Sequence, residues 1–277
     1  MKPYSLCVLG NSHTGAFKQA WSNRKPAVAP GFALTFFAAS NFHLENLSCR
    51  DGALVPGHLD LAEKFRNTSQ GKDRIALADY DALVLIGANF GIDVAAICAK
   101  EGTVEHLKWK SLKRVYSHAC FSAGLAAEFE ATLAIKLADQ IRSVSNIPVL
   151  LCPKPYPSEK LLREPELAKD PRFRDAELLG LVVAEAKAVA AAVAARRSCE
   201  ILWQDEDTIQ IPGFTKAEFG LGAVHLNDRK NAPEDDARHM NEEFGFRSLM
   251  VALNRLDDIS GGRVLGAPER TAKVARA

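Results

Sequence analysis

The sequence has almost no excess charge of either sign. Its 35 lysine and arginine residues nearly balance its 34 aspartate and glutamate residues, so the formal net charge at neutral pH is only +1. Nucleic acids and anionic membranes normally bind a clustered basic surface, which this composition does not favour. We therefore expect neither nucleic acid nor a membrane as a partner.

The sequence also lacks cysteine pairs at metal-ligand spacing. Its six cysteines are far apart along the chain: Cys7, Cys49, Cys98, Cys120, Cys152 and Cys199. Several of them lie in apolar segments, as free buried thiols do in a reducing compartment. Strand-like sequence begins by Tyr4, which leaves no room for a signal peptide. Together these features predict a cytoplasmic location.

No long hydrophobic run is free of charged residues. The most apolar stretch, from Leu178 to Ala195, contains Glu185 and Lys187 and is rich in alanine. Alanine is a strong helix former, and the two charges suit an amphipathic helix of a soluble protein better than a membrane span. The pattern predicts a long helix over residues 175–197.

Three familiar strand-turn-helix motifs are absent from the turn at residues 10–15, which follows an apolar run at 6–9. A phosphate-binding P-loop would have a lysine after Gly15, and a dinucleotide fingerprint would have a glycine where Ser12 stands. The nucleophile elbow of α/β-hydrolases would have a glycine in place of Thr14. The turn nevertheless holds Ser12 at the carboxyl end of a predicted strand and beside a helix N-terminus, where ligands collect and free N–H groups stabilise negative charge. Ser12 is the first candidate for chemistry.

Strand-like and helix-like segments alternate along the chain. Apolar, β-branched or aromatic runs predict five strands, at 6–9, 32–38, 81–87, 147–152 and 199–203, and helical periodicity appears at 128–143 besides 175–197. This alternation predicts an α/β fold, a three-layer α/β/α sandwich around a mostly parallel five-stranded sheet. We expect one domain over residues 1–258 and a flexible tail over 259–277.

Two longer stretches interrupt this alternation. Residues 40–79 are polar and contain only short apolar pieces, which predicts an irregular excursion over the surface without an assigned role. Residues 153–174 are rich in proline and follow the carboxyl end of a predicted strand. That end of a parallel sheet is where ligands bind, so we expect 153–174 at the rim of an active site.

Three polar blocks resemble those of the SGNH, or GDSL-type, hydrolases. The first is Gly10-Asn11-Ser12, in which asparagine replaces the usual aspartate, and the second is Gly87-Ala88-Asn89. The third is the pair Asp236 and His239, spaced Asp-x-x-His ahead of a predicted helix. The resemblance implies the flavodoxin-like fold of that family. It also implies a catalytic triad of Ser12, His239 and Asp236, with Ser12 N–H and the Asn89 side chain in the oxyanion hole.

One element of the family is missing. A glycine that donates its N–H to the oxyanion usually follows the second strand, but here Ala39 and Ser40 follow it. Because any residue except proline has an N–H, Ala39 or Ser40 could serve, and Gly52 is a further alternative. Asn11, His13 and His118 are candidates for the substrate pocket.

Other assignments of the acid and the base remain open. Asp235 could replace Asp236 if the local turn differs by one residue. His225 has a nearby carboxylate in Asp228 and is a second candidate for the base, although the order of the two residues is reversed. A histidine three residues after an aspartate also occurs as a plain surface hydrogen bond.

The resemblance implies a serine hydrolase of carboxylic esters that needs no metal and no organic cofactor. Its expected substrates are short acyl esters, such as acetyl esters, of small molecules or glycans. An acyltransferase with the same triad is one alternative. A non-catalytic protein that binds a small polar ligand or glycan is another, motivated by Asn11 and by the missing glycine.

Overall fold

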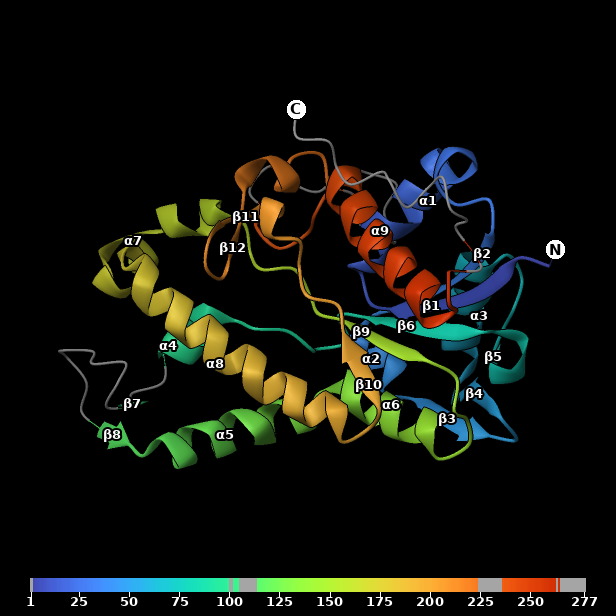
Figure 1. Ribbon diagram of the computed structural model, residues 1–277, viewed down its shortest axis with the longest axis horizontal. Helices are drawn as coiled ribbons and strands as arrows, with labels where there is room; N and C mark the ends of the chain where they lie inside the picture. The colour runs from blue at the N-terminus through green and yellow to red at the C-terminus, as the bar shows by residue number, and fades with distance from the viewer. Residues whose placement is uncertain (1, 100–101, 105–113, 224–235, 263, 265–277) are drawn as a thin grey trace.

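A computed structural model describes residues 2–99, 102–104, 114–223, 236–262 and 264 (Figure 1). Its centre is a five-stranded sheet of β10 (Cys199–Ile201), β9 (Val149–Cys152), β6 (Ala82–Ile86), β1 (Tyr4–Gly10) and β2 (Phe32–Ala38), in that order. Every neighbouring pair is parallel. Counted along the chain, the five strands have the order 2-1-3-4-5 that flavodoxin-like folds share. The predicted α/β fold is confirmed.

The strands are apolar on both faces, which is why they form the middle layer. Along β1, Cys7 and Leu9 point into the hydrophobic core on one face of the sheet, the larger core, whereas Leu6 and Val8 point into the smaller core on the other face. The same alternation holds along β6. Strands covered on both faces read as continuous hydrophobic runs, and that pattern made these segments recognisable.

Helices cover both faces of the sheet and complete the three layers (Figure 1). The smaller core lies under α1 (Thr14–Val28) and α9 (Glu242–Ile259). The larger core contains residues of four longer helices: α3 (Leu59–Ser69), α5 (His118–Glu130), α6 (Leu133–Arg142) and α8 (Ala176–Ala195). The predicted three-layer sandwich is confirmed.

Helix α8 is, by length and composition alone, apolar enough to cross a membrane. It packs against α5 and β10, and 44% of its most apolar window is buried inside the protein. Leu179 and Val182 are fully buried in the larger core. These contacts are those of a core helix in an α/β sandwich.

The prediction that residues 40–79 form an irregular excursion is wrong. They contain α2 (Asn41–Leu44), β3 (Leu47–Arg50), β4 (Ala53–Pro56), α3, β5 (Ile75–Ala76) and the 3-10 helix η1 (Leu77–Asp79). The three strands form an antiparallel sheet. Leu61 and Phe65 of α3 are fully buried in the larger core. Their spacing of four residues is a helical signal that the polar residues around them obscured.

The single helix predicted over 128–143 is two helices. α5 ends at Glu130 and α6 begins at Leu133, with Thr132 between them in an extended conformation. The Thr132 hydroxyl donates to the Phe129 carbonyl at 2.6 Å. Threonine forms such local bonds at helix boundaries, so one hydrophobic period can run across a break between two helices.

The remaining elements are short and lie between the main strands and helices. They are α4 (Val94–Ala99), β7 (Gly102–Val104), β8 (Arg114–Tyr116), η3 (Glu159–Arg163), α7 (Pro165–Lys169), η4 (Pro171–Arg174), η5 (Glu206–Thr208), β11 (Ile209–Ile211), β12 (Phe214–Thr215) and η6 (Ala217–Gly220).

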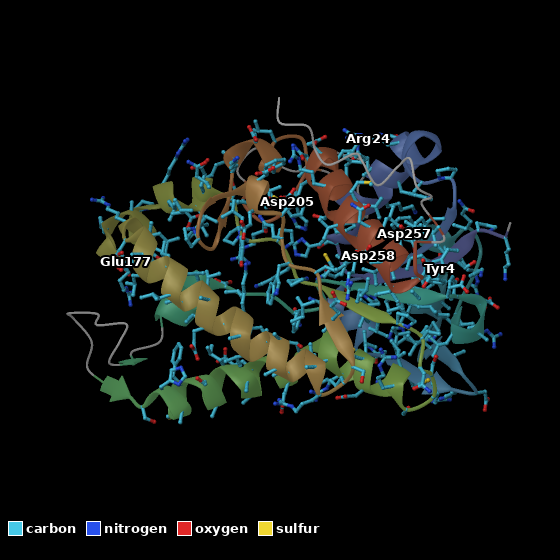
Figure 2. All side chains as sticks on the ribbon, viewed as in Figure 1. Tyr4, Arg24, Glu177, Asp205, Asp257 and Asp258 are labelled. Carbon is cyan, nitrogen blue, oxygen red and sulfur yellow. The ribbon has the colours of Figure 1, made fainter. Side chains whose placement is uncertain are left out.

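The start of the predicted tail is packed. α9 ends at Ile259, and Val264 then contacts the smaller core while its N–H donates to the buried Asp257 carboxylate at 2.9 Å. Figure 2 labels Asp257 on α9. The rest of the predicted tail, residue 263 and residues 265–277, lies outside the described residues.

Candidate active site

Ser12 lies in the turn between β1 and α1, and backbone hydrogen bonds to both neighbouring strands fix this turn. The Asn11 N–H donates to the Ile86 carbonyl of β6, and the Ala39 N–H after β2 donates to the Gly10 carbonyl. A Cβ on Gly10 would lie 2.5 Å from the Ile86 carbonyl oxygen, so only glycine fits there. The sheet thereby holds Ser12 at its carboxyl edge, where sequence analysis placed it.

The loop that carries Asp236 and His239 is fixed by its connection to α9. Asn241 caps this helix by accepting from the Phe244 N–H at 3.1 Å. Its Nδ2 donates to the carbonyls of Glu218 and Leu221 at 2.9 and 3.0 Å. The cap ties the loop to the chain around η6.

A second tether joins the same loop to the proline-rich stretch 153–174. The Ser158 N–H of that stretch donates to the Ala237 carbonyl at 2.7 Å. This contact lies within the Asp236–His239 segment, so the stretch borders the site.

Close packing of α1 against α9 brings the turn and the loop together. A Cβ on Gly245 would lie 2.2 Å from the Ala16 carbonyl oxygen, a distance that no real side chain could occupy. Arg24 of α1, labelled in Figure 2, pairs with Glu242 and Glu243 in the first turn of α9, at 3.1 and 2.9 Å. Glycine at this crossing lets the two helix backbones touch.

Ser12, His239 and Asp236 form a continuous chain of hydrogen bonds. His239 Nε2 is 2.9 Å from Ser12 Oγ, and His239 Nδ1 is 2.7 Å from Asp236 Oδ2. The other carboxylate oxygen, Asp236 Oδ1, accepts the N–H groups of Arg238 and His239 at 2.8 and 3.0 Å. Both carboxylate oxygens are therefore engaged. The imidazole stands between a hydroxyl and a carboxylate, as the relay of a serine proton requires.

The Asp236 carboxyl is charged at neutral pH. Burial favours its neutral form, but the N–H of Arg238 together with the ring and N–H of His239 outweigh burial and lower its pKa to about 2. A charged carboxylate can accept a hydrogen bond from Nδ1–H. The proton is then on Nδ1, and Nε2 is the unprotonated nitrogen that can accept the serine proton.

His13 lies against the ring of His239. The centroids of the two rings are 5.3 Å apart and their planes make an angle of 31°. Burial, followed by electrostatic interactions with His239 and Lys154, lowers the pKa of His13 to about 3. His13 is neutral over the physiological range, so it packs against His239 as a neutral ring.

Asn89 follows β6 in an unusual turn. Gly87, Ala88 and Asn89 all have positive φ, at 67°, 47° and 61°. Left-handed backbone costs residues other than glycine about 1 kcal/mol each, so neighbouring contacts must hold it. The Gly87 N–H donates to the Cys152 carbonyl, and the Ala88 carbonyl accepts the Ala134 N–H at the start of α6. The turn presents the Asn89 side chain, which is exposed, at the same sheet edge as Ser12.

The backbone N–H groups near this edge of the sheet differ in whether they already donate a hydrogen bond within the protein. The Ala39 N–H donates to the Gly10 carbonyl and is not free for an oxyanion. Within the described residues, the N–H groups of Ser12 and Ser40 have no protein acceptor. Ser40 is the N-cap of α2, and its hydroxyl lies 2.6 Å from His43 Nδ1. Gly52 is in the turn between β3 and β4, so Ser40 remains the better candidate for a third donor.

The structure does not bring His118 into the chain that joins Ser12, His239 and Asp236. His118 is the first residue of α5, and its Nε2 lies 2.9 Å from Glu185 of α8. The alternative residues Asp235, His225 and Asp228 lie outside the described residues. Within the described residues, no cluster of three or more histidine, cysteine, aspartate or glutamate side chains could hold a metal ion.

Sequence analysis missed two residues of this region. Asn41 contacts both Asn11 and Asn89 through its side chain. Gly245 allows the contact between α1 and α9. Asn41 offered a weak signal, because it follows the second strand at the edge where ligands bind. Gly245 offered none, because a glycine inside a helical pattern does not reveal what packs against it.

Comparison of the sequence with protein-family models and with curated proteins finds no match. Among solved structures, the chain is similar to LAE5, described as an alpha/beta hydrolase enzyme from the metagenome of Lake Arreo, Spain. The two are 14% identical with a TM-score of 0.35, and the alignment covers 95% of this chain and 97% of LAE5. At this identity and TM-score, the function of the chain rests on the geometry of its own residues.

Proposed function

We propose that the chain is a serine hydrolase of the SGNH type that cleaves carboxylic esters. The observation that carries the proposal is the hydrogen-bond chain from Ser12 Oγ through His239 to Asp236, with distances of 2.9 and 2.7 Å. A serine hydroxyl is a weak nucleophile at neutral pH, and an adjacent imidazole held by a carboxylate is what activates it.

In the proposed reaction, Ser12 Oγ attacks the ester carbonyl carbon while its proton moves to His239 Nε2. The tetrahedral intermediate collapses when His239 gives that proton to the departing alkoxide, which leaves as the alcohol and leaves an acyl group on Ser12. Water then attacks the acyl carbon with His239 again as the base, and the acid and the free serine result. Asp236 keeps its charge throughout and orients the imidazole.

The oxyanion of the tetrahedral intermediate would be stabilised by donors at the same edge of the sheet. Ser12 N–H, Ser40 N–H and the Asn89 carboxamide are the groups proposed for this role. Loss of one such donor costs an acyl-transfer enzyme roughly 3 to 4 kcal/mol of transition-state stabilisation.

We propose short acyl esters, such as acetyl esters, of small molecules or carbohydrates as the substrate class. The resemblance to the SGNH blocks supports this choice. A sugar hydroxyl could replace water in the second step with the same residues in the same roles. Product analysis with an acyl donor and candidate sugars distinguishes the two, because a transferase forms acylated sugar faster than free acid.

Labelling with a fluorophosphonate and hydrolysis of short-chain aryl esters test the proposal together. Wild type should be labelled stoichiometrically and should cleave the ester, and Ser12→Ala should do neither. Ser143→Ala, in the exposed residue after α6, is the matched control and should behave as wild type. Equal ester hydrolysis by wild type and Ser12→Ala would remove Ser12 from the mechanism. A wild type that resists both probes would favour a binding protein.

A further inference from the structure

We propose that Asn11 and Asn41 are positioning residues that determine which end of the Asn89 carboxamide faces the reacting oxygen. The inference deepens the proposed function and rests on it, because Asn89 matters here as an oxyanion donor. A carboxamide has an accepting oxygen at one end and a donating NH2 group at the other. Only the donating end can stabilise an oxyanion, so the orientation of Asn89 decides whether it helps or hinders.

The orientation begins with one backbone N–H. The N–H of His13 donates to Asn11 Oδ1 at 3.2 Å. A backbone N–H can only donate, so the end of Asn11 that it meets must be the oxygen. Asn11 is 7% exposed, and a Cβ on Gly87 would lie 2.6 Å from Asn11 Oδ1. The Asn11 carboxamide is therefore held in a buried space that a glycine leaves open.

Two further hydrogen bonds carry this orientation to Asn89. Because the Asn11 oxygen is used by His13, Asn11 presents its Nδ2 to Asn41, and Nδ2 donates to Asn41 Oδ1 at 3.2 Å. Asn41 must then present its own Nδ2 at its other end, and it donates to Asn89 Oδ1 at 2.6 Å. Once the orientation of the Asn11 carboxamide is fixed, the carboxamides of Asn41 and Asn89 can each form these hydrogen bonds in only one orientation.

As a consequence, the oxygen of Asn89 faces Asn41, and its Nδ2 is the end that is not bonded to Asn41. The Asn89 side chain is exposed at the sheet edge, and within the described residues no protein group accepts from its Nδ2. The His13 N–H, acting through Asn11 and Asn41, thus leaves the Asn89 NH2 group able to donate to an oxyanion.

This arrangement requires asparagine, and not aspartate, at position 11 opposite Asn41. An aspartate there would accept from the His13 N–H with one oxygen and would accept from Asn41 with the other. Asn41 would turn its Nδ2 toward position 11 and its oxygen toward Asn89. Asn89 would in turn donate to Asn41 and present its oxygen to the oxyanion, where two like partial charges repel. In this chain, Asn11 and Asn41 are a matched pair.

A double-mutant cycle tests this coupling through kcat for ester hydrolysis. Asn11→Asp should lower kcat roughly 100- to 1,000-fold with little change in KM, as loss of an oxyanion donor does. Asn41→Ala frees Asn89 to adopt either orientation, and we expect a loss of about tenfold. The double variant should equal Asn41→Ala, because without Asn41 the reversal cannot reach Asn89.

An additive result would overturn the proposal, since a negative charge at position 11 would then act directly on the oxyanion. Asn46→Asp is the matched control. It places the same new charge on an exposed residue shortly after α2, where Asn46 Nδ2 contacts the Phe42 carbonyl. This variant should retain the wild-type kcat.

Neutron diffraction from deuterium-exchanged wild-type crystals gives a readout that does not depend on activity or on variants that fold. It should show deuterium on the end of Asn41 that faces Asn89, and none on the end of Asn89 that faces Asn41. The opposite arrangement would overturn the proposal. If the orientation is as stated and no ester is cleaved, the proposed function fails while the orientation of the three carboxamides stands.

Discussion

The turn that carries Ser12 and the loop that carries His239 are held in place by different means. Backbone hydrogen bonds to β6 and to the residue after β2 hold the Ser12 turn, so its position follows from the sheet itself. The His239 loop is held by the side chain of Asn241 and by the N–H of Ser158, both from outside the sheet. The serine is therefore fixed by the main sheet, and the histidine by contacts outside it, two of which depend on the Asn241 side chain.

This difference predicts that the Ser12 turn tolerates changes in nearby side chains better than the His239 loop does. Substitutions that act on the loop should reduce activity more than they reduce stability. Substitutions in the packing of α1 against α9, which supports both the turn and the loop, should reduce activity and stability together.

Asp236→Asn should have the largest effect on activity. Its amide can favour the wrong imidazole tautomer, so kcat/KM for ester hydrolysis should fall about 10⁴-fold. Asp235→Asn is the control and should keep the wild-type rate. If the Asp235 variant loses activity and the Asp236 variant keeps it, the orienting carboxylate is Asp235.

Gly245→Val should affect both parts of the site at once. Its side chain would overlap the Ala16 backbone, so α1 and α9 must separate. We expect a loss of about 1 to 3 kcal/mol in the free energy of unfolding, and roughly 100-fold in kcat/KM because Ser12 and His239 move apart. Denaturant unfolding and ester hydrolysis measure the two.

Gly180→Ala in α8 is the control for this change. A Cβ there would meet only Pro212 at 3.8 Å, an ordinary contact, so the variant should be as stable as wild type or slightly more stable. Equal stability of the Gly245 variant and wild type would show that the two helices do not need to touch.

Asn241→Ala separates the capping of α9 from the tethering of the loop. It removes the cap and both donations from Nδ2, so we expect a loss of about 1 kcal/mol in stability and about tenfold in kcat/KM. Asn241→Asp keeps an oxygen for the Phe244 N–H but cannot donate to the Glu218 and Leu221 carbonyls. It should keep most of the stability and lose as much activity as the alanine variant. Full activity of the aspartate variant would contradict tethering by Nδ2.

The pH dependence of the free energy of unfolding should report the titration of His13. The pKa of His13 is lowered to about 3 in the folded protein by burial, His239 and Lys154, whereas an unfolded histidine titrates near 6.5. Below pH 6.5 the unfolded chain binds a proton that the folded chain does not, so stability falls as the pH falls toward 3. Between pH 6.5 and 4.5, wild type should lose about 1 to 2 kcal/mol more than His13→Gln in denaturant titrations. Parallel losses would show that His13 does not titrate in this way.

The main sheet was predictable because each of its strands is a short apolar run with turn residues beside it. The Ser12 turn and the Asp236/His239 pair were recognisable for a similar reason, since each is a local pattern of a few residues. Residues 40–79 were not predicted correctly, because the only buried apolar residues of α3 are Leu61 and Phe65, within a polar segment. A helix with so few buried positions gives a weak periodic signal.

Contacts between distant segments that no family pattern marks could not be predicted. The role of Gly245 depends on Ala16, and the orientation of Asn89 depends on Asn11 and Asn41. Single asparagines and glycines are ordinary turn and helix-boundary residues, so their type alone carries little information. Only the folded arrangement shows which of them act together.

The bond between Ser12 and His239 joins residues that are 227 positions apart in the sequence. A ribosome makes the serine before the histidine, and domains generally fold as units. While the residues between them are translated, the nascent chain therefore carries the serine without the histidine proposed as its base. The proposed nucleophile therefore stays inactive until α9 has been made and has packed against α1.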